Sequence, residues 1–414
     1  MQMHIINEDQ HNKDLFIDHT RIINKIEKSI KIYNWKFILS LLPPGSILVG
    51  GYIRDIILER LSNHIDIDIV VPENSITIGK KISQNFNGRF ILLDKEREVV
   101  RIIFKTISID IASQISKSLT YDLISRDFSI NSIAYSFEKN SLIDPLNGIK
   151  DIENGLLRTN SKENLLDDPL RILRCFRFVS ELDFTLEKKL VAFIKKYNHK
   201  LSLVAKERIN YELQRIIRGQ KAKKSICLIK EFQIFNFIQS EVNLIKTELE
   251  KIDFDMLNQK EKKEFLPLFF LIQIFDEVSL KIFLFSKSEI LNAKLLRKWL
   301  LILNKKNIVD LNENERFDLH QELEAILPCF IFYLPEKLQL EWLKRWRDKN
   351  DKLFHPTNLI KGSAIKNHLN IEEGPLFGKL IRYLSVEIAF DRLHNFDQTI
   401  YKAKQWIQQN APKM

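Results

Sequence analysis

Glycine, proline and cysteine are scarce in this chain of 414 residues, with 11 Gly, 11 Pro and 3 Cys. The cysteines, Cys175, Cys227 and Cys329, lie far apart in apolar contexts, so we expect reduced core residues of a cytoplasmic protein and no zinc site. No apolar run approaches the roughly 20 residues that a membrane-spanning helix needs. The polar, acid-containing start, residues 1–16, predicts neither a signal peptide nor an Arg-rich transit peptide.

The abundant residue types indicate a globular chain. Apolar residues make up 45% and charged residues 29%, and the length leaves room for about two to four domains with a sizeable core. The net charge of +10 permits a polyanionic partner such as nucleic acid. A composition rich in Ile, Asn and Lys would give the same excess, so charge alone does not decide between the two explanations.

Two kinds of periodicity divide the chain. Turn signals and strand-like alternation concentrate in residues 43–160, whereas helical spacing of apolar residues continues nearly throughout from Asn160. The segment RIIFKTISIDIAS (101–113) predicts a hairpin or two short strands, and residues 19–40 are helix-like. We therefore predict an α+β fold, with a small mixed unit followed by a long all-helical region.

Two acids interrupt an apolar strand in ILVGGYIRDIILERLSNHIDIDIV (47–70). Residues 65–71 alternate, so Asp66 and Asp68 share the face opposite the isoleucines. One explanation is a solvated face on an edge strand. The other is a divalent metal between the carboxylates, since Mg²⁺ prefers hard oxygen ligands and substrate phosphates.

The same stretch contains a glycine turn between a strand and a helix. Gly50 and Gly51 follow the apolar Ile47–Val49 and precede an apolar-periodic segment from Tyr52 to about Leu61. Glycines let backbone N–H groups approach a phosphate, although a plain tight turn is their usual meaning. Arg54 adds a fixed guanidinium, so this element could hold a triphosphate next to the metal of the acid pair.

The pattern GGYIRD … DID resembles the nucleotidyltransferase superfamily that includes DNA polymerase beta. Within it, the pattern is similar to the class II tRNA nucleotidyltransferases (CCA-adding enzymes) and the bacterial poly(A) polymerases. The resemblance implies a polymerase-beta-like head with a mixed sheet, then a helical neck, body and tail. We expect a helical extension (1–44), a catalytic head (45–155), a neck that recognises the base (156–220), and a body and tail that bind tRNA (221–414).

A third carboxylate and a second motif follow the acid pair. Asp110 alternates with isoleucines in ISIDIAS, so it is either an exposed strand acid or the third metal ligand of a two-metal site. Arg126 and Asp127 open SRDFSINSIAYS, where Asp127 could be a helix N-cap. The resemblance implies instead that they contact the ribose and phosphates of the nucleotide. The family often has Arg and Thr where this chain has Ser125 and Ser129.

The segment DDPLRILRCFRF (167–178) places three arginines on one helix. Arg171, Arg174 and Arg177 follow at steps of three, and the rest of the helix is apolar. Three guanidiniums on so apolar a helix are costly unless they meet anions such as triphosphate or RNA. Asp168, before Pro169, could be only an N-cap.

Asp168 and Arg171 could also read a base. Asp accepts hydrogen bonds and Arg donates them, which suits the adjacent donor and acceptor of cytosine or adenine and disfavours uracil and guanine. In the family this pair is the protein template, although Glu usually stands where this chain has Asp167. Glu207 and Arg208 resemble the last family motif and are expected to brace this helix through ion pairs.

The resemblance implies an enzyme that adds CCA, or part of it, to the 3′ end of tRNA from CTP and ATP and releases pyrophosphate. Asp66, Asp68 and Asp110 would bind Mg²⁺, with Asp110 helping to deprotonate the primer 3′-OH. We expect no membrane association and no stable protein partner. The residues expected to bind the nucleotide are Gly50, Gly51, Arg54, Arg126, Asp127, Asp168, Arg171, Arg174 and Arg177.

Other functions stay open from sequence. A CC-adding or A-adding specialist and a poly(A) polymerase share the same core, and an RNA-binding protein with an inactive head is a different class. The segment LEWLKRWRDKNDK (340–352) has the basic and aromatic mix of an RNA contact, but an ordinary amphipathic helix has it too. A metal phosphohydrolase is disfavoured, because RLHNFD (392–397) has no His-Asp dyad with partner histidines.

Overall fold

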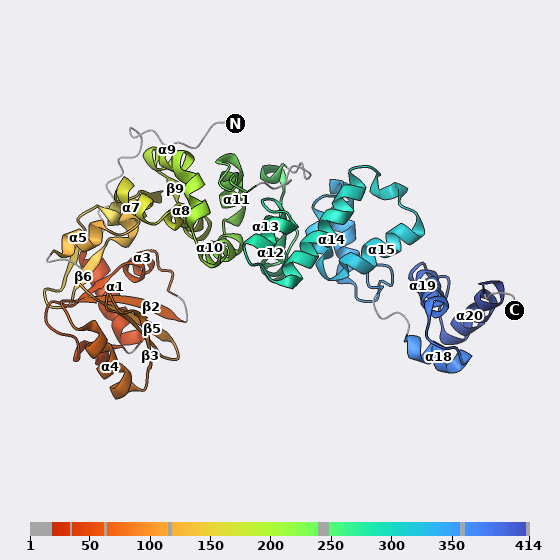
Figure 1. The fold of residues 1–414 in the computed structure, drawn as a ribbon, viewed down its shortest axis with the longest axis horizontal. Helices are drawn as coiled ribbons and strands as arrows, with labels where there is room; N and C mark the ends of the chain where they lie inside the picture. The colour runs from red at the N-terminus through yellow and green to blue at the C-terminus, as the bar shows by residue number, and fades with distance from the viewer. Residues whose placement is uncertain are drawn as a thin grey trace. The chain divides into compact units, whose positions relative to one another are not determined.

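The computed structural model describes residues 19–33, 35–61, 64–114, 118–238, 248–356 and 361–410. Much of the predicted N-terminal extension, residues 1–18, lies outside the described part of the chain. The chain divides into two compact units, residues 1–237 and 238–414, which are described separately (Figure 1). Within the described ranges, no helix has the length and apolar character needed to cross a membrane.

Unit 1 contains a seven-stranded mixed sheet with the order β3-β4-β5-β2-β1-β6-β7. Among the described strands of this sheet, only β2 and β5 pair in parallel, and the other neighbours are antiparallel. The predicted α+β fold is confirmed. The strands are β1 (Ile47–Val49), β2 (Ile65–Val71), β3 (Arg89–Asp94), β4 (Val99–Ile103), β5 (Ile107–Ser113), β6 (Ala134–Ser136) and β7 (Ser141–Ile143).

The alternation seen in the sequence fixes the faces of the central strands. Ile65, Ile67 and Ile69 of β2 are buried, while Asp66 is exposed and Asp68 is partly covered on the other face. The predicted hairpin in residues 101–113 is present as the antiparallel pair β4 and β5.

Short helices surround the sheet. Helix α3 ends at Ile57, earlier than the predicted Leu61, and Glu59 adopts a left-handed conformation with φ of 54° that does not continue a helix. Helix α1 contacts α3 and β7, and Ser29 Oγ lies 2.7 Å from Tyr52 Oη. These helices are α1 (His19–Ile32), α2 (Lys36–Leu39), α3 (Gly51–Ile57), α4 (Ser75–Phe86), α5 (Leu119–Ile124), the 3₁₀ turn η1 (Ser129–Asn131) and α6 (Gly148–Glu153).

The rest of unit 1 is almost entirely helical, around α8. Helix α8 packs on α10 and on α11, where Ser225 Oγ donates to the carbonyl of Phe176 at 2.8 Å. Unit 1 therefore includes α11, beyond residue 220, where we predicted the body to begin. The elements are β8 (Leu156–Leu157), α7 (Lys162–Asp167), α8 (Leu170–Leu182), β9 (Thr185–Leu186), α9 (Lys188–Tyr197), η2 (Asn198–Leu203), α10 (Lys206–Arg218) and α11 (Ala222–Glu231).

Unit 2 is all helical over its described residues, as predicted. Three of its helices begin with a capping box, at Asn258, Ser286 and Asn312. Each of these side chains accepts a hydrogen bond from the backbone N–H of a Glu three residues later, and the Glu side chain accepts one from the backbone N–H of the cap residue. Its helices are η4 (Leu249–Lys251), α12 (Gln259–Ile272), α13 (Glu277–Ile282), α14 (Lys287–Leu303), η5 (Ile308–Asp310), α15 (Glu313–Leu323), η6 (Glu324–Ile326), α16 (Leu327–Ile331), α17 (Glu336–Arg347), α18 (Gly362–Leu369), α19 (Pro375–Ala389) and α20 (Phe396–Asn410).

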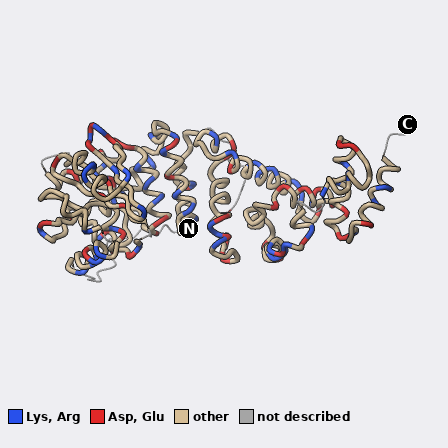
Figure 2. Tube along the Cα trace, turned by 90° about the horizontal axis from the view of Figure 1, so that it is seen from below, with Lys and Arg blue, Asp and Glu red and all other residues tan. Residues whose placement is uncertain are grey.

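Helix α17 carries the basic and aromatic segment that the sequence offered as an RNA contact. Trp342 packs on the rings of His320 and Phe354, with centroid distances of 5.0 and 5.3 Å. Trp346 Nε1 donates to the carbonyl of Glu324, and Arg347 pairs with Glu261. Because these side chains are engaged within unit 2, the structure favours the amphipathic-helix explanation. Figure 2 shows basic and acidic residues interspersed along the trace of both units.

Candidate active site

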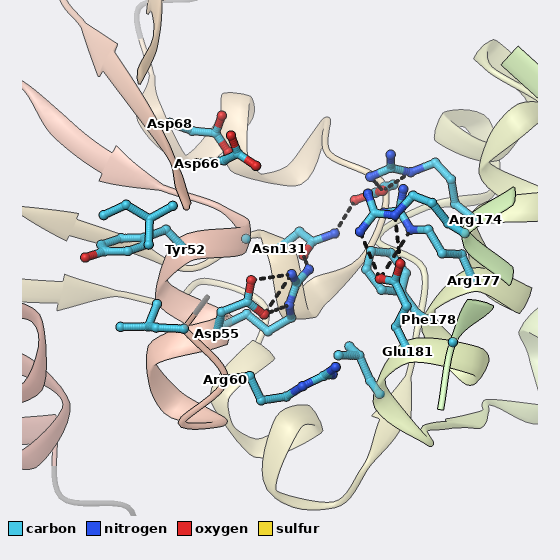
Figure 3. A pocket seen from close by; sticks show the side chains of 18 of the residues that line it. Tyr52, Asp55, Arg60, Asp66, Asp68, Asn131, Arg174, Arg177, Phe178 and Glu181 are labelled. Atoms are coloured by element: carbon cyan, nitrogen blue, oxygen red, sulfur yellow. Dashed lines mark hydrogen bonds and ion pairs between the residues drawn. The ribbon is translucent and has the colours of Figure 1, made fainter. Parts of the chain in front are cut away.

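A cavity of about 780 Å³ lies in unit 1 between the head and helices α8 and α10. Figure 3 shows the acids of β2 on one side and the arginines of α8 on the other. Four predicted site residues, Gly50, Asp110, Asp168 and Arg171, are not among those that line it. The eight that do are Gly51, Arg54, Asp66, Asp68, Arg126, Asp127, Arg174 and Arg177.

The glycine turn lets two charged side chains approach the backbone. Gly50 has a φ of 83°, a conformation that favours glycine. A Cβ atom at Gly50 would lie 2.8 Å from Arg126 Nη1 and 3.0 Å from Asp68 Oδ2. Any side chain at this position would therefore displace a guanidinium or a carboxylate of the site.

The two acids of β2 differ in environment. Asp66 is exposed, whereas burial raises the pKa of Asp68 above its usual value. Arg126 opposes this shift, and the nearby charges of Asp110 and Asp66 add to it. Asp68 and Asp110 are also direct neighbours in the parallel register of β2 and β5. The three carboxylates thus gather at one part of the sheet.

Asp110 already has a cationic partner. Arg101 of β4 donates to both carboxylate oxygens at 2.7 Å each, and this pairing raises the pKa of Arg101. No cluster of three or more His, Cys, Asp or Glu in the described ranges has metal-binding geometry. Asp66 and Asp68 still match Mg²⁺, which commonly takes one or two carboxylates and completes its shell with water and substrate phosphates.

Arg54 is oriented by an amide that sequence reasoning missed. Its Nη1 donates to Asn131 Oδ1 at 2.6 Å, and its other nitrogens donate to Asp55 at 3.0 Å. Asn131 Nδ2 in turn donates to Asp127 Oδ1 at 2.9 Å. Asn131 therefore connects the glycine-turn helix to the second motif. Its position four residues after Asp127 was the available signal.

Asp127 is a buried acid of the cavity wall that accepts hydrogen bonds from three other residues. It does not cap an α-helix: one oxygen accepts from Phe128 N and Asn131, and the other from Arg174 Nε at 2.8 Å. Burial would raise the pKa of Asp127, but the charge of Arg174 and the bond from Asn131 hold it below its usual value. Asp127 is thus a buried carboxylate, and Arg174 is fixed beside it.

Arg177 pairs with an acid of the chain itself. Its Nη1 donates to Glu212 Oε1 at 3.0 Å, and both side chains are buried. Burial lowers the pKa of Arg177 to about 10 and raises that of Glu212. The guanidiniums of Arg54, Arg174 and Arg177 also lie 5.2, 5.7 and 4.6 Å from the centroid of the Phe178 ring.

Glu212 was not predicted, although a signal was present. It lies on the apolar face of α10 with Ile209, Leu213 and Ile216, where an acid needs a buried partner. The carboxylates of Asp127 and Glu212 therefore pair with Arg174 and Arg177 without any ligand.

The proposed base readers lie at the start of α8, where Pro169 is the N-cap and Asp168 Oδ1 accepts from Leu170 N at 3.3 Å. Asp168 pairs with Arg208 at 2.7 Å, so the ion pair predicted for Arg208 is confirmed. Arg171 Nη1 donates to the carbonyls of Ser125 and Asn164 at 3.3 and 3.0 Å. Both readers are thus engaged with the protein.

Two family models and several known proteins are similar to this chain. Residues 46–158 match the family model "Poly A polymerase head domain", and residues 183–245 match "Probable RNA and SrmB- binding site of polymerase A". The CC-adding tRNA nucleotidyltransferase of Synechocystis is 29% identical over 402 residues, 89% of this chain and 95% of that protein. That of Geobacter sulfurreducens is 38% identical over 42% of this chain and 40% of its own.

Solved structures share the fold. The CCA-adding enzyme of Thermotoga maritima, solved in complex with tRNA, has a TM-score of 0.71 at 20% identity and covers 94% of this chain and 98% of that one. A CCA-adding enzyme solved with CTP has a TM-score of 0.74 at 22% identity and covers 96% and 99%.

The fold and the cavity define a nucleotidyltransferase of the polymerase-beta type with a helical extension. Its head matches the poly(A) polymerase head family, and most of its length is similar to CC-adding and CCA-adding tRNA nucleotidyltransferases.

Proposed function

We propose that the protein adds CCA, or part of it, to the 3′ end of tRNA, using CTP and ATP and releasing pyrophosphate. The observation that carries this proposal is the convergence of Asp66 and Asp68 with Arg54, Asp127 and Arg174 on one cavity. Acids and fixed guanidiniums on opposite walls suit a nucleoside triphosphate whose α-phosphate must be attacked. The proposed location is the cytoplasm, which agrees with the three free cysteines.

Mg²⁺ would be held by Asp66 and Asp68, and also by Asp110 once Arg101 releases it. When bound, the ion supplies positive charge next to the reacting phosphates. Arg54 and Arg126 bind the triphosphate beside Gly50 and Gly51. The 3′ oxygen of the tRNA bonds to the α-phosphorus as the bond to pyrophosphate breaks, and Asp110 assists the departure of the hydroxyl proton.

Base choice is assigned to Asp168 and Arg171. For both side chains to hydrogen-bond to a base, Arg171 must give up a hydrogen bond to a backbone carbonyl and donate to the ring acceptor of the base instead. Asp168 must turn one carboxylate oxygen toward the amino group of the base. Arg177, held by Glu212, is a positioning residue for this helix in the proposal.

We expect Arg171→Ala to loosen the preference for C and A over U and G by roughly 10- to 100-fold, because the acceptor of the base loses its donor. The measurement is kcat/KM for each of the four nucleoside triphosphates. Arg215→Ala is a matched control, since Arg215 lines the cavity from α10 and pairs with Glu181. If U and G stay fully rejected in Arg171→Ala, the reader assignment is wrong.

The product of the wild-type reaction tests the function. Purified protein receives Mg²⁺, CTP, ATP or both, and tRNAs that end before CCA, after C and after CC. Three additions to the first tRNA, requiring both nucleotides, support CCA addition. A long adenosine ladder on any RNA indicates a poly(A) polymerase, and no addition on any substrate contradicts the proposal.

CC-only addition is the second candidate, and a specific observation favours it. The relatives from Synechocystis and Geobacter sulfurreducens are both named as CC-adding enzymes, the former over most of its length. In the same assay, a product that stops after two cytidines with ATP present identifies this activity. Action on the CC-ended tRNA alone identifies an A-adding specialist.

A further inference from the structure

Residues 188–206 carry an uninterrupted excess of positive charge away from the active-site cavity. This stretch, which forms α9, η2 and the first residue of α10, contains no Asp or Glu. Its lysines are Lys188, Lys189, Lys195, Lys196, Lys200 and Lys206. Such a run on one element is a binding surface for a polyanion or a solvated face, and the surrounding side chains distinguish the two.

Aromatic rings are interleaved with these lysines. The Phe193 and Tyr197 rings are 4.5 Å apart between centroids at an angle of 34°, and the His199 ring follows 6.5 Å from Tyr197. Lys162 and Lys196 lie 5.7 and 5.4 Å from the centroid of Tyr197. Rings flanked by cations form a platform on which a base can stack while its phosphates meet lysines.

A second cavity, of about 420 Å³, opens beside this platform. It shares no lining residue with the active-site cavity. Three cationic side chains face one acid there. Its lining residues are Arg158, Thr159, Lys162, Glu187, Lys189 and Phe193.

One of these cations is held in an ion pair, and the other two are exposed lysines, of which Lys162 also lies against the Tyr197 ring. Arg158 is fixed by Asp151 at 2.8 Å and by the carbonyl of Leu146. Within the described part of the chain, Lys162 and Lys189 form no ion pair, and both are exposed. The cavity thus combines a fixed guanidinium, two adjustable ammonium groups and an apolar ring.

We propose that this cavity and the rings of α9 bind one unpaired nucleotide of the RNA substrate and its flanking phosphates. The inference rests on the proposed function. RNA is favoured over a free nucleotide because the lysines continue past the cavity along α9 and η2, as a phosphodiester chain requires. Helices α9 and η2 also lie within residues 183–245, which match the RNA-binding family model, whereas Arg158, Thr159 and Lys162 of the cavity precede that range.

The test is tRNA affinity of the full chain with Lys162→Gln and Lys189→Gln combined. The Kd for tRNA should rise about tenfold, and the slope of log K against log salt should fall by about two, one for each lost phosphate contact. The control is Lys80→Gln with Lys81→Gln, two exposed lysines on α4, which Figure 1 shows well apart from α9 within unit 1. The control should keep the wild-type affinity.

A second variant isolates the stacking contact. Phe193→Leu keeps an apolar side chain and should raise the Kd for tRNA about fivefold or more with no change in salt slope. Wild-type affinity and slope in both variants would overturn the site. A rise in the KM for CTP with tRNA affinity unchanged would also overturn it, because a free nucleotide would then be the ligand.

Binding and addition are read separately, so the two proposals can fail independently. A wild-type protein that binds tRNA through these lysines but adds no nucleotide would contradict the proposed function and support the site. If the wild type adds nucleotides but all of the variants bind tRNA with wild-type affinity, only the proposed binding site is contradicted.

Discussion

Asp68→Asn is expected to lower kcat for nucleotide addition by about 10³-fold or more while tRNA affinity stays within about twofold. The substitution keeps the shape of the side chain and removes the charge that a cation and the reacting phosphate require. Asp68 lies beside Arg126 and is the direct neighbour of Asp110 across β2 and β5. Single-turnover addition of CTP to tRNA and direct tRNA binding are the two measurements.

Asp66→Asn should give a loss of similar size, because the two acids share one face of β2. Asp94→Asn is the matched control: Asp94 is on the same sheet and accepts from the backbone N–H groups of Glu96 and Arg97, which an amide oxygen can also do. Its kcat should remain near the wild-type value. Normal addition by either the Asp66 or the Asp68 variant would mean that the acid pair is not the catalytic centre.

Arg174→Met should destabilise unit 1 by about 3 kcal/mol, because it leaves the buried carboxylate of Asp127 without its cation. Met preserves most of the length and apolar contact of the side chain, so the loss reports the charge. The two measurements are the free energy of unfolding in urea and the hydrogen exchange of α8. Lys25→Met is the control, since Lys25 pairs with Glu59 at a similar distance of 2.7 Å but at the exposed surface.

The same variant has a defined pH dependence. Because Arg174 holds the pKa of Asp127 below its usual value, the ion pair stabilises the wild type at neutral pH. That contribution is lost as the pH falls below about 4 toward the lowered folded-state pKa. The stability difference between wild type and Arg174→Met should therefore shrink as the pH falls, beginning above pH 4, because burial raises the pKa of Asp127 once Arg174 is removed. A difference that is constant with pH would mean that Arg174 acts through packing alone.

The sequence predicted the parts of the site that local patterns encode. Alternation placed Asp66 and Asp68 on one face of a strand, and the glycine pair located the turn beside them, because strand and turn geometry depend on near neighbours. The α+β order followed from the same periodicities. The resemblance to a known family supplied the roles of these residues.

The sequence did not predict which charged groups would pair. Arg101 meets Asp110 only because β4 and β5 are adjacent in antiparallel register, and Arg177 meets Glu212 only because α8 packs on α10. These partners are 9 and 35 residues apart in the chain. Ion pairing depends on tertiary distance, so a sequence shows that a buried arginine needs an anion without showing which one.

The packing of α1 has a consequence for synthesis of the chain. Its apolar residues Ile22, Ile26 and Ile30 are buried in a helix that contacts α3 and β7, and β7 begins only at Ser141. At roughly 5–20 residues per second, α1 leaves the ribosome several seconds before β7 exists. Helix α1 therefore stays partly uncovered until most of the head has been translated.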